Sequence, residues 1–461
     1  MTYPNVLVMG YLKETGQLTP EWRMKAESAI NAGYQRILSF EAKGGGFDWY
    51  SGGQARTLLT AYGILLLADM NRVYPIDTRV IDRARDLLFK RQGGDGSWEL
   101  DVPVHTWHQM GDAKLPVTAY VTWALRQAGI QDAGVGRALD WLQGHRDEAS
   151  DPYVRALVAL AVGDRASMES LERDARVEGD AARWETRGEG LYHARGETAS
   201  IEATALAALA LLREGRSPLI DKALTSIARS KDASGSWQST QATILCIKAL
   251  LEASKAPAVP PRPVEISLSV NGREVGGLKP LTRETFDVVQ QVEIPAAEGE
   301  NVIELSLKGE ARVSYQVFGR YYLPWSKVPE PSRPVLEIST RYDRAELRLS
   351  DRLKAVTTLR YHGPGTFMVI ADLGIPPGFT PDTASFEALV KERVIDKYSF
   401  TGRQITLYFG RVEKGRTHEI EYALTPRFPI RAQAPRPNAY EYYSPQNEAS
   451  GRPQALRVTE E

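Results

Sequence analysis

The sequence predicts a multidomain α plus β protein, in which an α/α toroid of helical hairpins is followed by two antiparallel β-sandwich domains. Apolar residues recur at helical spacing from Pro4 to Ser254. A turn made of glycines and an aromatic residue repeats along the same stretch. Beyond a proline-rich break, apolar residues alternate with period two, as they do in strands. A chain of 461 residues is long enough for about two to four such domains.

Helix-start signals divide the first region. In Thr19-Pro20-Glu21-Trp22, threonine can cap the helix, proline suits the first helical position and an acid follows in the first turn. Because hairpins pair their helices, an odd number of helices leaves one without a partner, and we expect a further helix upstream. Eleven helices are predicted, at about 4–14, 20–41, 53–71, 78–91, 115–128, 134–146, 152–162, 166–176, 199–214, 218–229 and 239–254.

The repeated turn predicts how the helices are arranged. Its copies follow one another at intervals of about 50 residues or twice that, which suits one helical hairpin per repeat. Several hairpins in a ring bury a core that no single hairpin could bury. The copies are Gly45-Gly46-Phe47-Asp48-Trp49, Gly94-Asp95-Gly96-Ser97-Trp98, Gly188-Glu189-Gly190-Leu191-Tyr192 and Ser234-Gly235-Ser236-Trp237, with a degenerate copy expected near Asp151-Pro152-Tyr153.

Two proline clusters mark the domain boundaries. Four prolines between Pro257 and Pro263 end the helical region, and a second cluster runs from Pro324 to Pro334. We therefore expect domains at 1–256, 263–324 and 330–450. Asn271-Gly272, after the alternating 265–270, is a strong hairpin signal. Further strands are predicted at 286–294, 301–308, 311–322, 354–361, 366–373, 397–400, 404–409 and 419–425, with a helix at 383–393.

Charge and cysteine content exclude several classes of function. Lys plus Arg number 57 and Asp plus Glu 58, so no net charge directs the chain to nucleic acid. The single cysteine, Cys246, can form no internal disulfide, which suits a reducing compartment or a bacterial exported protein. The first residues have no signal-peptide pattern, and the most apolar stretch, 62–68, is too short to span a membrane. We expect either a cytoplasmic protein or a piece of a longer exported one.

Motifs in three stretches resemble the α2-macroglobulin and complement family, and together they span nearly all of the chain. The small β domain would be the second half of that family's CUB domain, into which the helical domain is inserted. The helical region is similar to the thioester-containing domain through Gly44-Gly45-Gly46-Phe47, Leu59-Thr60-Ala61-Tyr62, Gly93-Gly94-Asp95-Gly96-Ser97-Trp98, Val117-Thr118-Ala119-Tyr120 and Trp237-Gln238-Ser239-Thr240-Gln241-Ala242-Thr243, and the last region resembles the receptor-binding domain through Met368-Val369-Ile370-Ala371-Asp372, Gly378-Phe379, Arg403-Gln404-Ile405-Thr406-Leu407-Tyr408 and Tyr440-Glu441-Tyr442-Tyr443.

This resemblance implies a protease trap. In that family a thioester joins the Cys and Gln side chains of a Cys-x-x-Gln motif, just ahead of a segment similar to 2–9. The present chain begins after that place, and Cys246 is followed by Ile247-Lys248-Ala249, so the chain holds no thioester. It would be the C-terminal portion of an endopeptidase inhibitor, not an enzyme, and would scaffold and shield the thioester. The implied partners are target proteases and upstream macroglobulin domains, without nucleic acid, metal or cofactor, in a periplasmic, extracellular or membrane-anchored parent.

The resemblance also places candidate site residues. His105 lies near the position of a histidine that activates the thioester in some complement proteins, and His108 is the alternative. A neutral imidazole can attack the acyl group and pass it to a hydroxyl. These two histidines have no evident third ligand, so we expect no metal. In mammalian relatives lysines of the last domain's helix engage an endocytic receptor, whereas the helix here offers Lys391 alone in its later part and is expected to pack through Phe386, Leu389 and Val390.

Two other functions remain open. Terpene cyclases and glycosidases also build toroids from hairpins, but no Asp-x-Asp-Asp motif occurs, and Asp48, Asp95 and Glu202 fit no spacing rule for sugar chemistry. A non-covalent interaction module is the other alternative. Trp49, Tyr50 and Trp98 are candidates for lining the thioester site, with core packing as the competing interpretation, and Cys246 is expected to be a small buried apolar residue.

Overall fold

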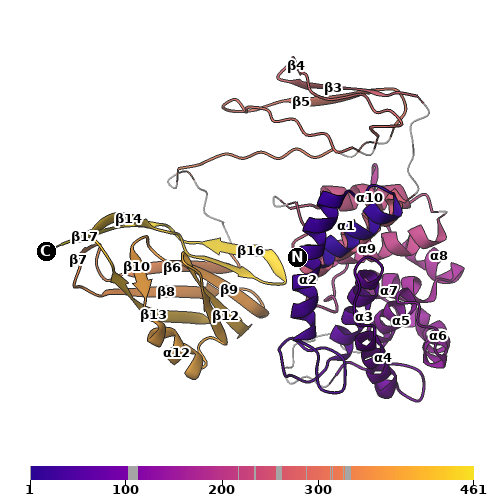
Figure 1. The fold of residues 1–461 in the computed structure, drawn as a ribbon, viewed down its shortest axis with the longest axis horizontal. Coiled ribbons are helices and arrows are strands. Elements are labelled where there is room, and N and C mark those ends of the chain that lie inside the picture. The colour runs from indigo at the N-terminus through magenta and orange to yellow at the C-terminus, as the bar shows by residue number, and fades with distance from the viewer. Residues whose placement is uncertain are drawn as a thin grey trace. The chain divides into compact units, whose positions relative to one another are not determined.

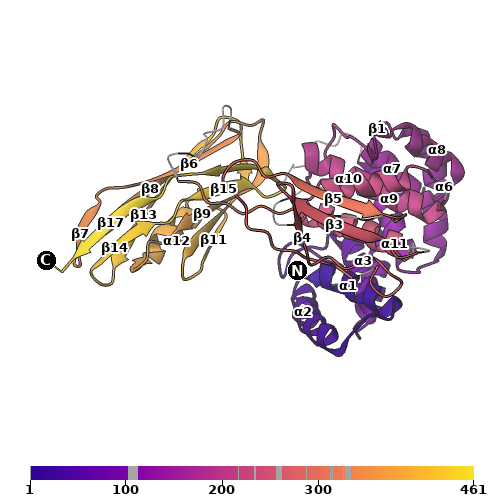
Figure 2. The ribbon, with the colours of Figure 1, turned by 90° about the horizontal axis from the view of Figure 1, so that it is seen from above.

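The computed structural model describes residues 2–101, 113–215, 217–232, 235–255, 262–286, 288–311, 313, 315–324, 327 and 334–460. The chain divides into two compact units, one made of residues 1–249 and 325–461 and the other of residues 250–324. Figures 1 and 2 show the N-terminal helical part of the first unit in indigo to magenta and its C-terminal part, residues 334–460, in orange to yellow. No described helix combines the length and apolarity that crossing a bilayer requires.

The helical part of the first unit is an α/α toroid followed by β structure, as the sequence predicts. α3, α5, α7 and α9 pack against one another in succession, and α2, α4, α6, α8 and α10 lie outside them. The helices of the described residues up to 254 are α1 Thr2–Glu14, α2 Pro20–Leu38, α3 Thr57–Asn71, α4 Arg79–Arg91, α5 Lys114–Gln127, α6 Ala133–His145, α7 Pro152–Val162, α8 Arg165–Arg173, α9 Gly196–Glu214, α10 Ile220–Arg229 and α11 Thr240–Ser254, with a short 3-10 turn Arg146–Glu148 and a two-stranded ribbon of β1 Arg176–Glu178 and β2 Ala181–Arg183.

Local chemistry explains where these helices begin and which way they face. Thr19 caps α2 as predicted, because its side-chain oxygen accepts a hydrogen bond of 3.3 Å from the Trp22 amide. Asp151 caps α7 in the same way, and Gly163 ends that helix in the left-handed conformation. The inner helix α9 buries five alanines between Ala203 and Ala210, which lets its neighbours approach closely. The outer helices bury one apolar face instead.

The repeated turn has a common structure that the sequence only partly predicted. In each copy, the amide of the aromatic residue donates to a threonine hydroxyl of a following inner helix. The third copy is centred on Trp184 rather than on Tyr192, because Trp184 makes these contacts and Tyr192 does not. The pairs are Phe47 with Thr60 at 3.1 Å, Trp98 with Thr118 at 2.9 Å, Trp184 with Thr204 at 3.1 Å and Trp237 with Thr243 at 3.2 Å, and the three indoles donate at 2.7 Å to the carbonyls of Leu88, Leu171 and Ile227.

A buried charge cluster joins α1, α3 and α11. The Lys248 ammonium donates to the Asp69 carboxylate, and the Tyr3 hydroxyl donates to the same carboxylate at 2.8 Å. The side chains of Lys248 and Asp69 are only 10% and 8% exposed. Buried charges are stable in a fold only when they are paired in this way. The cluster therefore links the last helix of the toroid to its first.

The second unit contains one antiparallel sheet in the order β4-β3-β5, formed by β3 Glu265–Val270, β4 Arg273–Val275 and β5 Ile303–Lys308. Asn271-Gly272 makes the predicted hairpin, with positive φ at both residues. The strands predicted at 286–294 and 311–322 were wrong, because no strand is formed by the described residues of either stretch. Alternation marks an apolar face, but a strand also needs a neighbouring strand to accept its hydrogen bonds.

The β part of the first unit packs antiparallel sheets around one apolar core that includes Leu359, Ile405 and Ile420. Its sheets have the orders β10-β13-β8-β6, β11-β12-β9-β15-β16 and β14-β17-β7, and only the β7 and β17 pair is parallel among them. The elements are β6 Leu336–Tyr342, β7 Glu346–Arg348, β8 Leu353–Tyr361, β9 Thr366–Gly374, β10 Phe379–Pro381, α12 Thr383–Lys391, β11 Lys397–Phe400, β12 Gln404–Val412, β13 Thr417–Pro426, β14 Ile430–Ala434, β15 Asn438–Glu441, β16 Ser444–Ser450 and β17 Gln454–Thr459.

Helix α12 packs on this core through the residues that its spacing predicted. Phe386 is fully buried and Leu389 is 9% exposed, while Val390 lies partly buried against the same core. Phe386 contacts the rings of Tyr398, Phe400 and Tyr422, with centroids 5.3 to 5.7 Å apart. The apolar face of the helix is therefore used for packing within the sandwich.

Candidate functional site

Five aromatic side chains from α1, α3, α5 and the loop before α9 form a continuous cluster in the toroid. We call Tyr3, Tyr62, Tyr120, Trp123 and Tyr192 the aromatic cluster. Its rings meet edge to face, with centroid distances of 5.9 Å from Tyr3 to Tyr62, 6.0 Å from Tyr62 to Tyr192, 5.6 Å from Tyr192 to Tyr120 and 5.6 Å from Tyr120 to Trp123. Burial raises the pKa of each of its tyrosines, so their hydroxyls stay neutral. The first turn of α1 therefore packs against neutral aromatic side chains.

The loop from residue 188 to residue 195 holds a charged network beside this cluster. Glu189 is 8% exposed, and its two carboxylate oxygens lie 2.8 Å from His193 Nδ1 and 3.0 Å from Arg195 Nη2. Burial on its own would raise the pKa of Glu189, but the hydrogen bond with His193 and the charge of Arg195 outweigh burial and lower that pKa. Tyr192 joins the loop to α3, because its hydroxyl donates to the Leu58 carbonyl at 2.9 Å.

Residues of the sandwich contact this loop within the same compact unit. Arg195 Nη1 donates to the Gly365 carbonyl at 3.1 Å. The His193 ring lies 5.5 Å from the Phe367 ring and 5.3 Å from the Tyr443 ring, measured between centroids. Tyr443 is partly buried, and burial raises its pKa. Aromatic and polar groups of the sandwich therefore cover the loop that borders the aromatic cluster.

A second contact joins α9, the last repeated turn and strand β16. The Thr198 hydroxyl lies 2.6 Å from Gln238 Oε1 and 3.3 Å from Gln446 Oε1. Gln238 has a φ of 62°, a left-handed conformation that non-glycine residues seldom adopt. Strain of this kind persists where surrounding contacts hold it, and it is frequent at functional sites. The turn that resembles the family's Trp-Gln-Ser-Thr-Gln segment is thus held against the sandwich.

Glu202 is a fully buried carboxyl group on α9. Its Oε1 atom accepts a hydrogen bond of 3.1 Å from the Ser239 hydroxyl, and its Oε2 atom has no hydrogen-bond partner among the described residues. A Cβ atom at Gly190 would lie 2.9 Å from Oε2, so only glycine fits there without a shift. Burial raises the pKa of Glu202 to about 8, although the Ser239 hydrogen bond acts in the opposite direction. The group is therefore largely protonated at neutral pH.

The candidate residues predicted from the sequence have different outcomes. His105 and His108 lie outside the described residues. Lys391 is exposed at the end of α12, and its contact with a receptor stays a prediction. Trp98 is 1% exposed and is a core residue, whereas Trp49 and Tyr50 are 47% and 65% exposed.

The three carboxylates considered for sugar chemistry do not form a common site. Asp48 Oδ1 lies 3.5 Å from Arg56 Nε, and Asp95 accepts hydrogen bonds from Ser97 in its own turn and from Lys114 at the start of α5. Cys246 is fully buried, and burial raises the pKa of its thiol. Within the described ranges, no group of three His, Cys, Asp or Glu side chains is placed to hold a metal ion. The aromatic cluster, the ion pairs of the 188–195 loop and the burial of Glu202 could not be predicted from the sequence, because each depends on contacts between segments far apart in the chain.

Comparisons with known proteins agree with this arrangement. A family model described as the A-macroglobulin TED domain matches residues 1–252, and one described as the A-macroglobulin receptor binding domain matches residues 364–452. Ovostatin of Gallus gallus is 24% identical to the chain over 471 aligned residues, which cover 95% of this chain and 31% of ovostatin. The chain therefore spans about a third of the length of that relative.

Two solved structures show the same fold. Native alpha-2-macroglobulin from Escherichia coli, spanning domain MG7 to the C-terminus, superimposes with a TM-score of 0.67 at 17% identity, over 99% of this chain and 72% of that one. Salmonella alpha-2-macroglobulin reacted with methylamine gives a TM-score of 0.67 at 18% identity, over 99% of this chain and 30% of that one.

Proposed function

Because the chain belongs to the α-macroglobulin family, we propose that it is the C-terminal portion of an endopeptidase inhibitor, in which it scaffolds and shields a thioester. In the parent molecule, a target protease cuts an upstream bait region, the inhibitor changes shape, and the protease is held covalently or sterically. Domains at 1–256, 263–324 and 330–450 correspond in this proposal to the thioester-containing domain without its motif, the second half of the CUB domain, and the receptor-binding domain.

The contact between the sandwich and the ring is the observation that supports the proposal. A Cys-x-x-Gln motif directly ahead of Thr2 would enter the structure beside Tyr3, which is 3% exposed and part of the aromatic cluster. Phe367 and Tyr443 cover the neighbouring loop, and Tyr442 is close enough to Tyr62 to contribute to its raised pKa. A thioester reacts with water, so excluding water preserves it until the protease arrives.

The chemistry of the parent would be an acyl transfer. An amine or hydroxyl of the protease attacks the thioester carbonyl, a bond to nitrogen or oxygen forms, the carbon–sulfur bond breaks, and the cysteine leaves as a thiolate that takes up the released proton. His105, or His108 as the alternative, would act first as a neutral nucleophile and then pass the acyl group to a hydroxyl.

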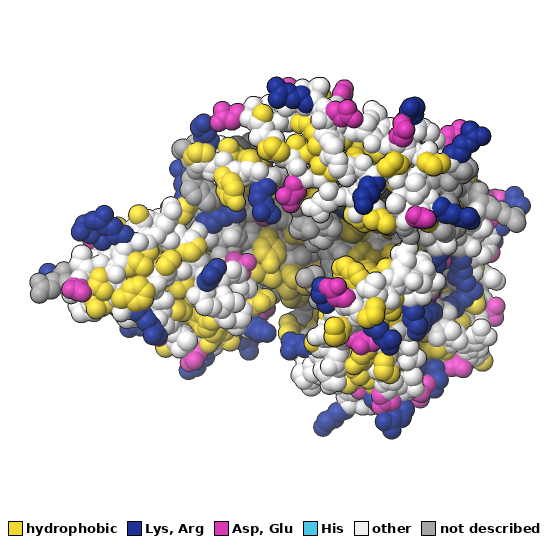
Figure 3. Space-filling view, turned by 45° about the horizontal axis from the view of Figure 1, so that its top comes forward, with side chains coloured by type: hydrophobic (Ala, Val, Ile, Leu, Met, Phe, Trp, Pro, Cys, Tyr) yellow, Lys and Arg dark blue, Asp and Glu magenta, His cyan; other side chains and the backbone are white. Residues whose placement is uncertain are grey.

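Exposed apolar residues in the second unit support an upstream partner. Val289, Tyr321 and Tyr322 are 92%, 77% and 90% exposed. Figure 3 also shows apolar side chains exposed between charged ones on the face that it presents. Large apolar side chains that are this exposed would be covered if another domain packed on the unit. Upstream macroglobulin domains of the same parent are the proposed cover, in a periplasmic or extracellular molecule.

A reconstituted parent tests the proposal. The reading frame is extended upstream to include the Cys-x-x-Gln motif, and free thiol is measured while methylamine or chymotrypsin is added. We expect thiol release by methylamine and retention of chymotrypsin in a complex that survives denaturing gels. Tyr443→Gly should speed thiol release in the absence of protease, whereas Tyr398→Gly, at a partly buried tyrosine that packs against Phe386, serves as the matched control. Thiol release without any retention of protease would contradict the inhibitor function.

His105→Ala in the reconstituted parent tests the activating histidine separately. We expect the variant to lose its preference for hydroxyl over amine targets, because direct attack on the thioester favours the better nucleophile. His108→Ala is the comparison. An unchanged preference in both variants would remove both histidines from the mechanism.

A further inference from the structure

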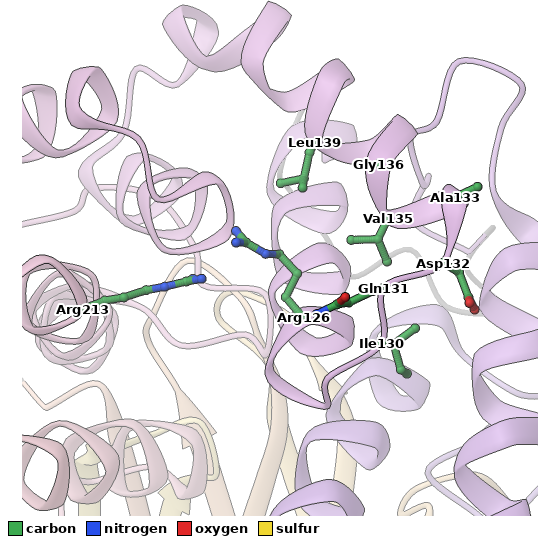
Figure 4. Close-up of a pocket in the computed structure, with 9 residues that line it drawn as sticks. All are labelled: Arg126, Ile130, Gln131, Asp132, Ala133, Val135, Gly136, Leu139 and Arg213. Carbon is green, nitrogen blue, oxygen red and sulfur yellow. The ribbon is translucent and has the colours of Figure 1, made fainter.

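A pocket lies where the loop between α5 and α6, the first turns of α6 and the end of α9 come together. Its volume is about 490 Å³. This is within the range of roughly 300 to 1,000 Å³ that is usual for small-molecule sites. Figure 4 shows Arg126 and Arg213 entering it from α5 and α9, with their guanidinium groups pointing toward one another. The contacts of the proposed thioester site use other residues of the toroid.

Each arginine is held in place by one of its terminal nitrogens. Arg126 Nη1 donates to the carbonyls of Ala161 and Val162, the latter at 3.1 Å. Arg213 Nη1 donates to the Leu160 carbonyl at 3.2 Å. These bonds satisfy the last carbonyls of α7, where the partial negative charge of the helix dipole also stabilises a cation. A guanidinium has five N–H donors, so each arginine keeps donors for a ligand while its position is fixed.

The α7 carbonyls offset the two guanidinium charges only in part, and no acidic side chain among the described residues pairs with either of them. Asp132 borders the pocket, but its carboxylate points away from Arg126 in Figure 4 and lies 3.7 Å from Arg85 Nε. Burial lowers the pKa of Arg126, and the like charge of Arg213 lowers it further. A bound anion would relieve this repulsion.

The rest of the lining is apolar on one side. Val135 and Leu139 reach the pocket from α6, and Ile130 reaches it from the preceding loop. Paired guanidiniums suit the planar, bidentate geometry of carboxylate and phosphate groups. We propose that this pocket binds a small organic oxyanion, in which a carboxylate or phosphate contacts Arg126 and Arg213 and a short apolar group lies on Ile130, Val135 and Leu139.

Calorimetric titration of the full chain tests this inference. The probes are hexyl phosphate and hexanoate, which combine both features, inorganic phosphate, which lacks the apolar group, and hexanol, which lacks the charge. We expect saturable binding of hexyl phosphate or hexanoate with one site per chain, at least about tenfold tighter than binding of inorganic phosphate. Hexanol should show no saturable binding, and hexanol binding as tight as that of the anions would overturn the proposal.

Two variants locate the site. Arg213→Gln removes one guanidinium from a side chain that is already exposed, and should weaken binding by about tenfold or more, because it removes a charge-assisted hydrogen bond. Gly136→Glu places a carboxylate at the pocket, where an added Cβ meets open space, and should block the anions by competition. Arg173→Gln, an exposed arginine at the end of α8, is the charge-matched control and should bind as the unaltered chain does.

Folding of each variant is checked by its melting temperature. Binding that is equal in the unaltered chain, Arg213→Gln and Gly136→Glu would place the anion elsewhere and overturn the inference. So would the absence of saturable binding for both organic anions.

Discussion

The protonated carboxyl of Glu202 predicts a specific pH dependence of folding. Its pKa is 4.5 in an unfolded chain and about 8 in the fold. Between these values the folded chain keeps a proton that the unfolded chain releases, so rising pH favours unfolding. Each pH unit in that window lowers the free energy of unfolding by about 1.4 kcal/mol. The contribution is complete below pH 4.5, is lost progressively as pH rises to about 8, and changes no further above it.

The variant Glu202→Gln removes the titration and keeps the size of the side chain. Between pH 5.5 and pH 8, we expect Glu202 to lower the free energy of unfolding by about 3 kcal/mol in the unaltered chain and to have no such effect in the variant. The glutamine amide would occupy the place of the unpartnered Oε2 atom, and this unsatisfied donor should cost about 1 to 3 kcal/mol at every pH. The unaltered chain should therefore be the more stable at pH 5.5, and its advantage should vanish or reverse near pH 8.

The assay is urea unfolding followed by tryptophan fluorescence, since Trp98, Trp184 and Trp237 are buried in the toroid. The measured quantity is the difference in free energy of unfolding between the two chains at each pH, because this difference cancels the titration of all other groups. Glu169→Gln on the surface of α8, where Glu169 pairs with Arg165, is the control and should leave the profile unchanged. Parallel profiles for Glu202→Gln and the unaltered chain would refute the buried-acid reasoning.

Two further predictions concern the stability of the toroid. Lys248→Met leaves the Asp69 carboxylate buried without its cation and should lower the free energy of unfolding by about 3 to 5 kcal/mol. Adding Asp69→Asn to this variant should restore most of the loss. If Lys248→Met alone is as stable as the unaltered chain in urea unfolding, the role of the ion pair is contradicted. Gly45→Ala should lower the melting temperature clearly more than Gly52→Ala. Both residues have positive φ, but only at Gly45 would a Cβ atom lie 2.6 Å from a backbone oxygen, that of Arg83. Equal shifts in melting temperature would show that this close approach is unimportant.

The expected helices illustrate how far local patterns reach. Thr19 and Pro20 mark the start of α2 through side-chain and backbone chemistry that needs no partner elsewhere, and the structure agrees with that prediction. The stretch 286–294 shows the limit, because its alternation is equally local but its strand would need a neighbour. The third repeated turn was misplaced for a related reason. Tyr192 follows glycines as the pattern requires, yet Trp184 makes the contacts with Thr204 and Leu171.

The sequence by itself determined the α/α toroid, the change to β structure after the first proline cluster and the family resemblance, since helical and strand periods and turn residues act over short stretches of chain. The tertiary structure decided which groups meet. The Lys248 ammonium lies over the Tyr3 ring, Glu202 packs closely against Gly190, and Arg126 faces Arg213. The spacing of apolar residues predicts which face of a helix or strand is buried. The burial and charge of a site depend on segments that only tertiary packing brings together.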